Sequence, residues 1–320
     1  EKINPFYLFS NQIINVYSAT NIFDIPRDYL DVILNCVILY EDSFDPNIFL
    51  STAELYFQHS PSYLSLTKFY QIMKIFLKTE KTLSELIQNL PQIIESFFYP
   101  VFQISEEDQF NFENDPPQFL DDIFPSVQEE ETPRSSAASC LYQSSAINPE
   151  LIPKIVFNFI IQILNNGSQF QSWEIFSIIL FFSKCSQYYS DGCSEFDQFT
   201  EQVISSNLQS EDPVLLSSSL IFLANFPINF GSALSCKHPF ILSSIYTLSS
   251  SASNPIICYL SCCACGHLLY LIKEQESFDS ASSLEIPPEV LTESLQNLFV
   301  TSQQFPTERM AQSVSNFIDF

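Results

Sequence analysis

The sequence predicts an all-α protein, and three observations support this expectation. Apolar residues recur at helical spacing along nearly the whole chain, and no stretch shows the alternation of apolar and polar residues that is typical of a β-strand. Only 4 glycines occur among 320 residues, too few for folds built on many tight β-turns or on glycine-rich phosphate loops. With 46% apolar residues, the chain can bury a large core.

The expected helices follow one another with short breaks. In residues 148–164, Pro149 and Glu150 suit a first turn, and the apolar residues after them recur at i, i+3 and i+4. Four other prolines lie at or near expected helix starts, where a missing N–H is harmless: Pro213, Pro239, Pro255 and Pro287. In chain order, helices are expected at residues 27–40, 46–58, 62–78, 83–99, 148–164, 172–189, 194–207, 212–226, 238–250, 254–274 and 287–302.

The regular spacing of these helices favours a repeat architecture. Paired helices that recur at a period of about 40 residues are typical of HEAT and armadillo repeats. The more specific expectation is therefore a right-handed α-solenoid of antiparallel helix pairs, with an all-α globule as the alternative. We expect HEAT-type repeats over residues 1–104, an acidic loop insertion at 105–133, and HEAT-type repeats over 134–320, the whole being part of one longer solenoid.

Negative charge is concentrated between Ser105 and Leu141. The chain has 37 acidic and 12 basic residues, a formal net charge of −25, and no Lys or Arg between Lys81 and Arg134. Closely spaced carboxylates repel one another, so an extended, hydrated loop is expected, either attracting basic partners or serving only as a solvated insertion. The field repels nucleic acid and anionic membranes. The candidate partner-binding residues are Glu106, Glu107, Asp108, Glu113, Asp115, Asp121, Asp122, Glu129, Glu130 and Glu131.

The order of residues around the acidic stretch is more specific than its charge. The run comprises Tyr99-Pro100, Glu106–Asp108, Phe112, Asn114-Asp115-Pro116, Phe119-Leu120, Asp121-Asp122, Thr132-Pro133 and Ala137-Ala138. It resembles the central region of transport receptors of the importin-β (karyopherin) superfamily, most closely the importin seven/eight group. The chain departs from that pattern at Phe112, where the family usually has Trp, and at Asp121, where it usually has Arg. The resemblance covers residues 99–138, and a helix is expected to restart after Thr132-Pro133.

The resemblance implies a nuclear transport receptor that binds basic protein cargo of the histone or ribosomal-protein kind. It also implies Ran-GTP as a partner, bound mainly through N-terminal repeats outside this chain, and the Phe-Gly repeats of nucleoporins. Such a receptor shuttles between cytoplasm and nucleus through the nuclear pore. Two alternatives stay open: a cytosolic α-solenoid scaffold or coat-type protein, and an export receptor similar to the exporter of importin-α.

No residue pattern points to catalysis, a cofactor or a metal. The three histidines, His59, His238 and His267, lie beside no nucleophile motif, and no Walker A, GxSxG or HExxH pattern occurs. Cys258, Cys262 and Cys265 share one face of an expected helix, a pattern that favours packing in a helix–helix contact over a zinc site. The 9 scattered cysteines indicate a reducing compartment, and the longest apolar runs, such as 175–182, are too short to cross a bilayer.

Overall fold

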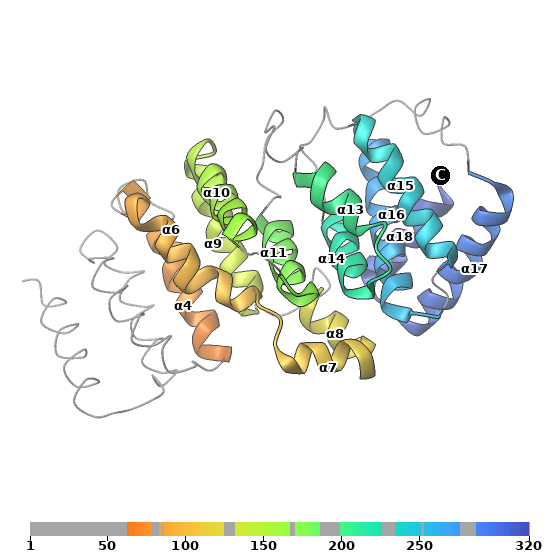
Figure 1. Ribbon diagram of the computed structural model, residues 1–320, viewed down its shortest axis with the longest axis horizontal. Coiled ribbons are helices and arrows are strands. Elements are labelled where there is room, and N and C mark those ends of the chain that lie inside the picture. Colours follow the sequence, from red (N-terminus) through yellow and green to blue (C-terminus); the bar gives the residue numbers. More distant parts are fainter. Residues whose placement is uncertain are drawn as a thin grey trace, which may run out of the picture. The chain divides into compact units, whose positions relative to one another are not determined.

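The computed structural model describes residues 63–77, 83–84, 86–124, 132–166, 170–185, 199–225, 234–250, 253–275 and 286–319. These residues form helices joined by short connections, and none of them forms a strand, so the all-α prediction is confirmed for this part of the chain (Figure 1). The predicted helices at 27–40 and 46–58 lie outside it. None of the described helices is both long and apolar enough to cross a membrane.

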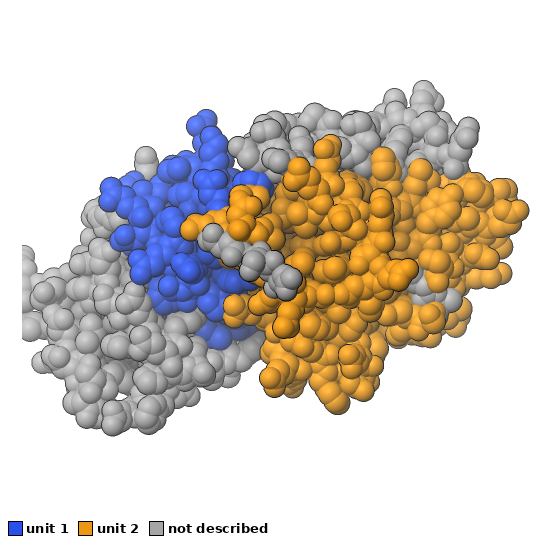
Figure 2. Space-filling model, in the orientation of Figure 1, with its two compact units in different colours: residues 1–101, 130–159 blue, residues 102–129, 160–320 orange. Residues whose placement is uncertain are grey.

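The chain divides into two compact units. Unit 1 comprises residues 1–101 and 130–159, and unit 2 comprises residues 102–129 and 160–320 (Figure 2). Helix α10 (Leu151–Asn166) begins in unit 1 and ends in unit 2. The division predicted from the sequence, into HEAT-type repeats with an acidic insertion, concerns repeat boundaries and not compact units, and it stays a prediction.

Unit 1 is built around helices α4 (Tyr63–Phe76) and α9 (Pro133–Ile147), which pack against each other. Tyr70 of α4 is fully buried, its hydroxyl donates to the carbonyl oxygen of Phe97, and the thiol of Cys140 donates to the carbonyl oxygen of Tyr70 over 2.8 Å. Segment 83–99 was expected as one helix. It is instead divided into η2 (Ile87–Asn89, 3-10), α6 (Leu90–Ile93), η3 (Ile94–Phe98, π) and η4 (Tyr99–Phe102, 3-10).

Two prolines account for this division. Pro91 lies in the segment and Pro100 directly follows it. Both lack the N–H that an unbroken α-helical ladder requires, and a proline ring clashes with the carbonyl four residues earlier. Short 3-10 and π turns shift the hydrogen-bond register and accommodate such positions. The segment still buries Ile94, Phe97 and Phe98.

Unit 2 is built from two interleaved series of helices. Each helix contacts the next but one: α11 with α14, α14 with α16, and α16 with α18 in one series, and α15 with α17 in the other, while α15 also contacts α16. Helix α16, apolar or small at most positions, lies in the middle of these contacts and is buried from Ile256 to Cys265. The unit-2 helices are α7 (Glu106–Asn114), α8 (Pro116–Ile123), α11 (Ser172–Cys185), η6 (Thr200–Ile204), α13 (Ser205–Asn207), α14 (Pro213–Ala224), α15 (Leu234–Ser250), α16 (Pro255–Gln275), α17 (Pro288–Gln304) and α18 (Glu308–Ile318).

Side-chain caps explain where several of these helices begin. Asp212 accepts a hydrogen bond from the N–H of Val214 over 2.8 Å at the start of α14, and Asn254 accepts from Ile256 and Ile257 over 3.1 Å at the start of α16. The predicted helix starts near Pro213, Pro255 and Pro287 are confirmed.

One expected helix start was wrong. Pro239 lies inside α15, which begins at Leu234, so the missing N–H of one proline does not stop this helix. Pro149 and Glu150 lie in the turn that leads into α10. Asn148 caps this turn, because its side chain accepts from the N–H of Leu151 and its carbonyl oxygen accepts from the N–H of Ile152, each over 3.2 Å, so the two residues occupy a first turn as expected. Helix α18 was not predicted, since its pattern consists mainly of two buried apolar residues, Met310 and Phe317, with Ser313 between them.

Candidate partner-binding surface

The first half of the acidic stretch is helical, and the prediction of an extended loop was wrong there. Residues 106–123 form α7 and α8, which bury Phe112, Phe119, Leu120 and Ile123. Burying each large apolar side chain contributes about 1.5–3 kcal/mol. Repulsion between two carboxylates in water amounts to about 1 kcal/mol even at 4 Å. Apolar burial therefore outweighs the charge density that suggested a loop.

Side-chain caps fix the starts of both helices, which meet at a corner at Asp115. Helix α7 begins with a capping box: Ser105 Oγ accepts from the N–H of Asp108 over 3.1 Å, and Asp108 Oδ2 accepts from the N–H of Ser105 over 2.8 Å. Asp115 ends α7 by donating its N–H to the carbonyl oxygen of Asn111 over 2.8 Å. The carboxylate of Asp115 also caps α8 by accepting from the N–H of Gln118 over 3.3 Å. One residue thus terminates the first helix and starts the second.

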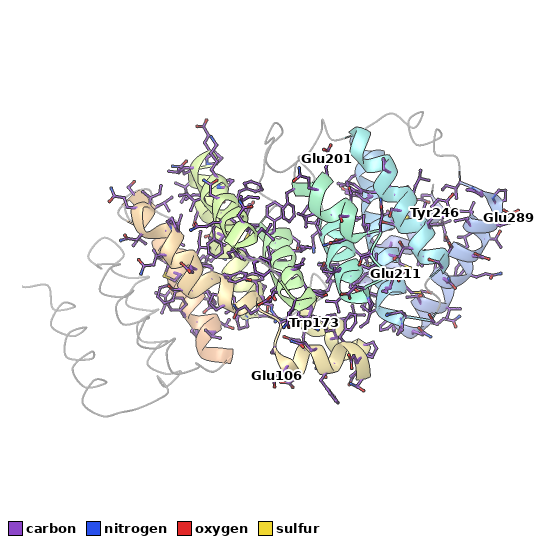
Figure 3. All side chains as sticks on the ribbon, in the orientation of Figure 1. Glu106, Trp173, Glu201, Glu211, Tyr246 and Glu289 are labelled. Carbon is purple, nitrogen blue, oxygen red and sulfur yellow. The ribbon has the colours of Figure 1, made fainter. Side chains whose placement is uncertain are left out.

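Aromatic contacts anchor α7 and α8 to α11. The ring centroids of Phe112 and Phe119 lie 5.0 Å apart, and Phe112 meets the indole of Trp173 edge-on at 5.2 Å. Phe119 contacts Phe176 at 6.0 Å. Edge-to-face pairs of this kind contribute about 0.5–1.5 kcal/mol beyond their burial. Trp173, labelled at the start of α11 in Figure 3, is the single tryptophan of the chain.

Phe124, directly after α8, anchors the other end of the pair of helices. The guanidinium carbon of Arg309 lies 4.0 Å from the centroid of the Phe124 ring, and Lys184 Nζ lies 5.6 Å from it. The ring also meets that of Tyr259, edge-on at 6.4 Å. The N–H of Ile104, just before α7, donates to Ser177 Oγ over 3.0 Å. Contacts at Ile104, at Phe112 and Phe119, and at Phe124 therefore fix the two acidic helices to the rest of unit 2.

The structure exposes most of the predicted partner-binding carboxylates. Six of them are exposed on α7, on α8 or at the corner between them: Glu106, Glu107, Glu113, Asp115, Asp121 and Asp122. Figure 3 labels Glu106 at the beginning of α7. Asp108 is the exception, because it is buried and both of its roles in the capping box are internal to the helix. Glu129, Glu130 and Glu131 lie outside the described residues.

This arrangement presents negative charge on a fixed support. Three carboxylates, Glu106, Glu107 and Asp108, occupy the first turn of α7, where the positive end of the helix dipole stabilises negative charge. Neither α7 nor α8 has a basic residue in its last turn. The two helices therefore form a pre-organised anionic surface, which requires less ordering on binding than a mobile loop would.

Sequence reasoning missed the residues that hold this surface in place. Trp173, Lys184 and Arg309 are distant in sequence, and no local pattern links them to the acidic stretch. The caps, in contrast, were visible: Ser105 precedes Asp108 by three residues, and Asp115 immediately precedes Pro116. Phe119, Leu120 and Ile123 also have the spacing of one helical face.

The cysteine-rich segment of α16 belongs to the core, as the sequence predicted. Cys258, Cys262, Cys263 and Cys265 are all buried. Burial raises the pKa of the Cys263 thiol to about 11, although Arg309, Tyr259 and Ser313 each act to lower it. Burial likewise raises the pKa of Cys262 and Cys265. Among the described residues, no group of three His, Cys, Asp or Glu side chains is arranged to hold a metal ion.

The histidines contribute little to a candidate site in the described residues. His267 is half-buried on α16, His238 lies within α15, and His59 is outside the described ranges.

No family model, curated protein or solved structure matches this chain. The resemblance to importin-β receptors consequently rests on residues 99–138 alone.

Proposed function

We propose that this chain binds basic proteins and forms part of a nuclear transport receptor of the importin-β type. In this proposal its helices belong to a right-handed superhelix of HEAT-like antiparallel pairs. The helix contacts of unit 2 support the architecture, because each helix of α11, α14, α16 and α18 contacts the next in that series. Contacts between successive helix pairs are what a solenoid of stacked repeats requires. Helix α8, which contacts α16 and, through Phe124 at its end, Arg309 of α18 far along the chain, lies outside this series as an insertion would.

The observation that carries the proposal is the exposed acidic surface of α7 and α8. Its six exposed carboxylates stand on helices fixed by Phe112, Phe119 and Phe124. The segment that contains them has no Lys or Arg of its own, so the neutralising charge must come from outside the segment. Complementary charge accelerates association and selects for cationic partners.

Nuclear transport is the specific form of this activity that the residue order favours. The run from Tyr99-Pro100 to Ala137-Ala138 is the basis for Ran-GTP and nucleoporin Phe-Gly repeats as further partners. Cargo release follows when Ran-GTP, bound mainly to other repeats, changes the pitch of the superhelix. Small shifts at successive repeat interfaces add along such an array.

The test measures cargo binding as a function of the nucleotide state of Ran. The complete protein is immobilised, a core histone or a basic ribosomal protein is bound, and Ran is added loaded with GTP or with GDP. We expect Ran-GTP to release an import cargo and Ran-GDP to leave it bound. Tighter cargo binding in the presence of Ran-GTP would indicate an export receptor. If cargo is released or retained to the same extent with Ran-GTP and with Ran-GDP, only a scaffold function remains.

A further inference from the structure

Phe110 on α7 is an exposed aromatic residue that the packing of the helix does not use. It exposes 63% of its surface, the largest fraction among the large apolar side chains of the described residues. Phe112, two positions further, provides the buried contact of α7 with Trp173 and Phe119. Phe110 therefore lies on the outward side of a helix whose inward side is already occupied.

Acidic and amide side chains surround Phe110 on the same side of the helix. Glu106 and Glu107 lie four and three residues before it, and Glu113 and Asn114 lie three and four residues after it. Residues at these spacings are neighbours on a helix surface. The three glutamates and Asn114 are exposed, and the Asn114 side-chain amide donates to the carbonyl oxygen of Phe110 over 2.9 Å. We call Glu106, Glu107, Phe110 and Glu113 the α7 face.

An aromatic ring flanked by carboxylates is complementary to a cationic side chain. The face of the ring attracts a guanidinium or ammonium group, and carboxylates beside it pair with the N–H donors of the same group. The protein uses this chemistry internally, where Arg309 lies over Phe124 at 4.0 Å. Because the Phe110 ring is exposed, a cation from outside the chain can reach it.

We infer that the α7 face binds an arginine side chain from a basic segment of the partner, stacked on Phe110 and paired with Glu106 or Glu113. This inference rests on the proposed function and names its contact residues. Arginine is favoured over lysine because its planar, weakly hydrated guanidinium stacks on a ring and also forms two parallel hydrogen bonds with a carboxylate.

Other occupants fit the α7 face less well. An apolar segment placed over Phe110 would remove water from the neighbouring glutamates without replacing their hydrogen bonds. A second copy of the chain would bring like charges together at the same face, which is unfavourable. Nucleic acid is repelled for the same reason. An arginine-containing segment satisfies both the ring and the carboxylates.

The test uses a fluorescein-labelled peptide of alternating Arg and Gly and the complete protein, with affinity measured by fluorescence anisotropy at low and moderate salt. Phe110→Ala and Phe110→Leu should each weaken binding about fivefold, since the leucine keeps an apolar contact but lacks the ring. The matched control is Phe299→Ala on α17, another exposed phenylalanine, at 51% exposure, and it should leave the affinity unchanged. Replacing every Arg of the peptide by uncharged citrulline should abolish binding.

The outcomes separate this inference from the proposed function. If the wild-type protein binds the peptide and Phe110→Leu binds it equally well, the α7 face is not the contact, while basic-partner binding survives. If Phe299→Ala weakens binding as much as Phe110→Ala, a general loss of apolar surface is responsible and the inference fails. If the wild-type protein binds neither the peptide nor a basic protein, both proposals fail together. Far-UV circular dichroism of each variant checks that helicity is retained.

Discussion

The guanidinium of Arg309 and the ring of Phe124 are stacked, with 4.0 Å between the guanidinium carbon and the ring centroid. Phe124 closes the acidic helix α8, and Arg309 belongs to α18. The ring is only 2% exposed, so the cation over it is partly removed from water. Cation–π pairs are stronger when they are removed from water. This contact joins the acidic surface to helices near the C-terminal end of unit 2.

Replacing Arg309 by Met should therefore weaken the anchoring of α8. The substitution keeps an apolar stem but removes the cation, so a loss of about 1 kcal/mol in the free energy of unfolding is expected. Lys184→Met is the matched control, and its effect should be smaller because Lys184 Nζ lies 5.6 Å from the same ring. Urea unfolding followed by circular dichroism gives both values, and equal effects would contradict a specific role for Arg309.

Phe112 should control the environment of the single tryptophan. In Phe112→Ala the ring that meets Trp173 at 5.2 Å is lost, and α7 loses its main apolar contact. We expect a red shift of tryptophan emission and a loss of about 3–5 kcal/mol in stability. Phe110→Ala, on the opposite side of the helix, should leave the emission unchanged. An unchanged spectrum in Phe112→Ala would show that α7 does not pack on Trp173.

The sequence predicted the helices better than their environment. The starts at Pro213 and Pro255 followed from local chemistry, because proline at a first turn and an Asp or Asn cap before it are both visible in the chain. Pro239 misled because a proline indicates a helix start only where the residues before it are not helical, and α15 already begins at Leu234. Proline and cap residues therefore predict a helix start correctly where the two occur together.

The acidic stretch shows the opposite error. Its closely spaced carboxylates suggest a loop, but the capping box at Ser105 and Asp108 and the burial of its apolar residues make it helical. The exposed positions of the carboxylates were nevertheless anticipated for all of the described candidates except Asp108. The contact of Phe124 with Arg309 could not be predicted, because it depends on how distant helices are brought together.

Asp108 and Glu107 should separate folding from binding. Asp108→Ala removes one half of the capping box and should lower stability by about 1 kcal/mol. Glu107→Ala changes the net charge equally at an adjacent but exposed position, so its stability should change by less than about 0.5 kcal/mol. Its affinity for a basic partner should fall, with a weaker dependence on salt. A larger stability loss for Glu107→Ala than for Asp108→Ala would contradict these roles.

Gly266 is required by the close approach of α16 and α18. A Cβ at this position would lie 2.5 Å from the Cα of Ser313 and 2.7 Å from its Cβ. Gly→Ala in a helix normally stabilises by about 1 kcal/mol. Here the clash should reverse the sign and cost about 1–3 kcal/mol, as overpacked sites do. The same close approach allows a hydrogen bond from the Asn316 side-chain amide to the carbonyl oxygen of Gly266, over 3.0 Å.

A second substitution tests the clash itself. Ser313→Gly in the Gly266→Ala background removes the clashing Cβ and Oγ atoms, but the backbone of residue 313 still lies 2.5 Å from the added methyl group. We therefore expect partial recovery of stability, measured by thermal unfolding of the single and double variants. Full recovery would mean that the backbones of α16 and α18 can separate readily, and no destabilisation by Gly266→Ala would mean that the two helices do not approach this closely.

The buried thiols should make stability fall at alkaline pH. Burial raises the pKa of Cys263 from its ordinary value of 9.0 to about 11, so above pH 9 the unfolded chain releases this proton while the native protein retains it. The unfolded state is then favoured, and the contribution of this thiol, complete below pH 9, should decline by about 2–3 kcal/mol by pH 11. Urea unfolding under reducing conditions from pH 7 to 11 measures the slope. Cys263→Ala should flatten it above pH 9 and leave the change between pH 7 and 8 unaltered, whereas parallel profiles would show that Cys263 ionises as readily in the folded protein as in the unfolded chain.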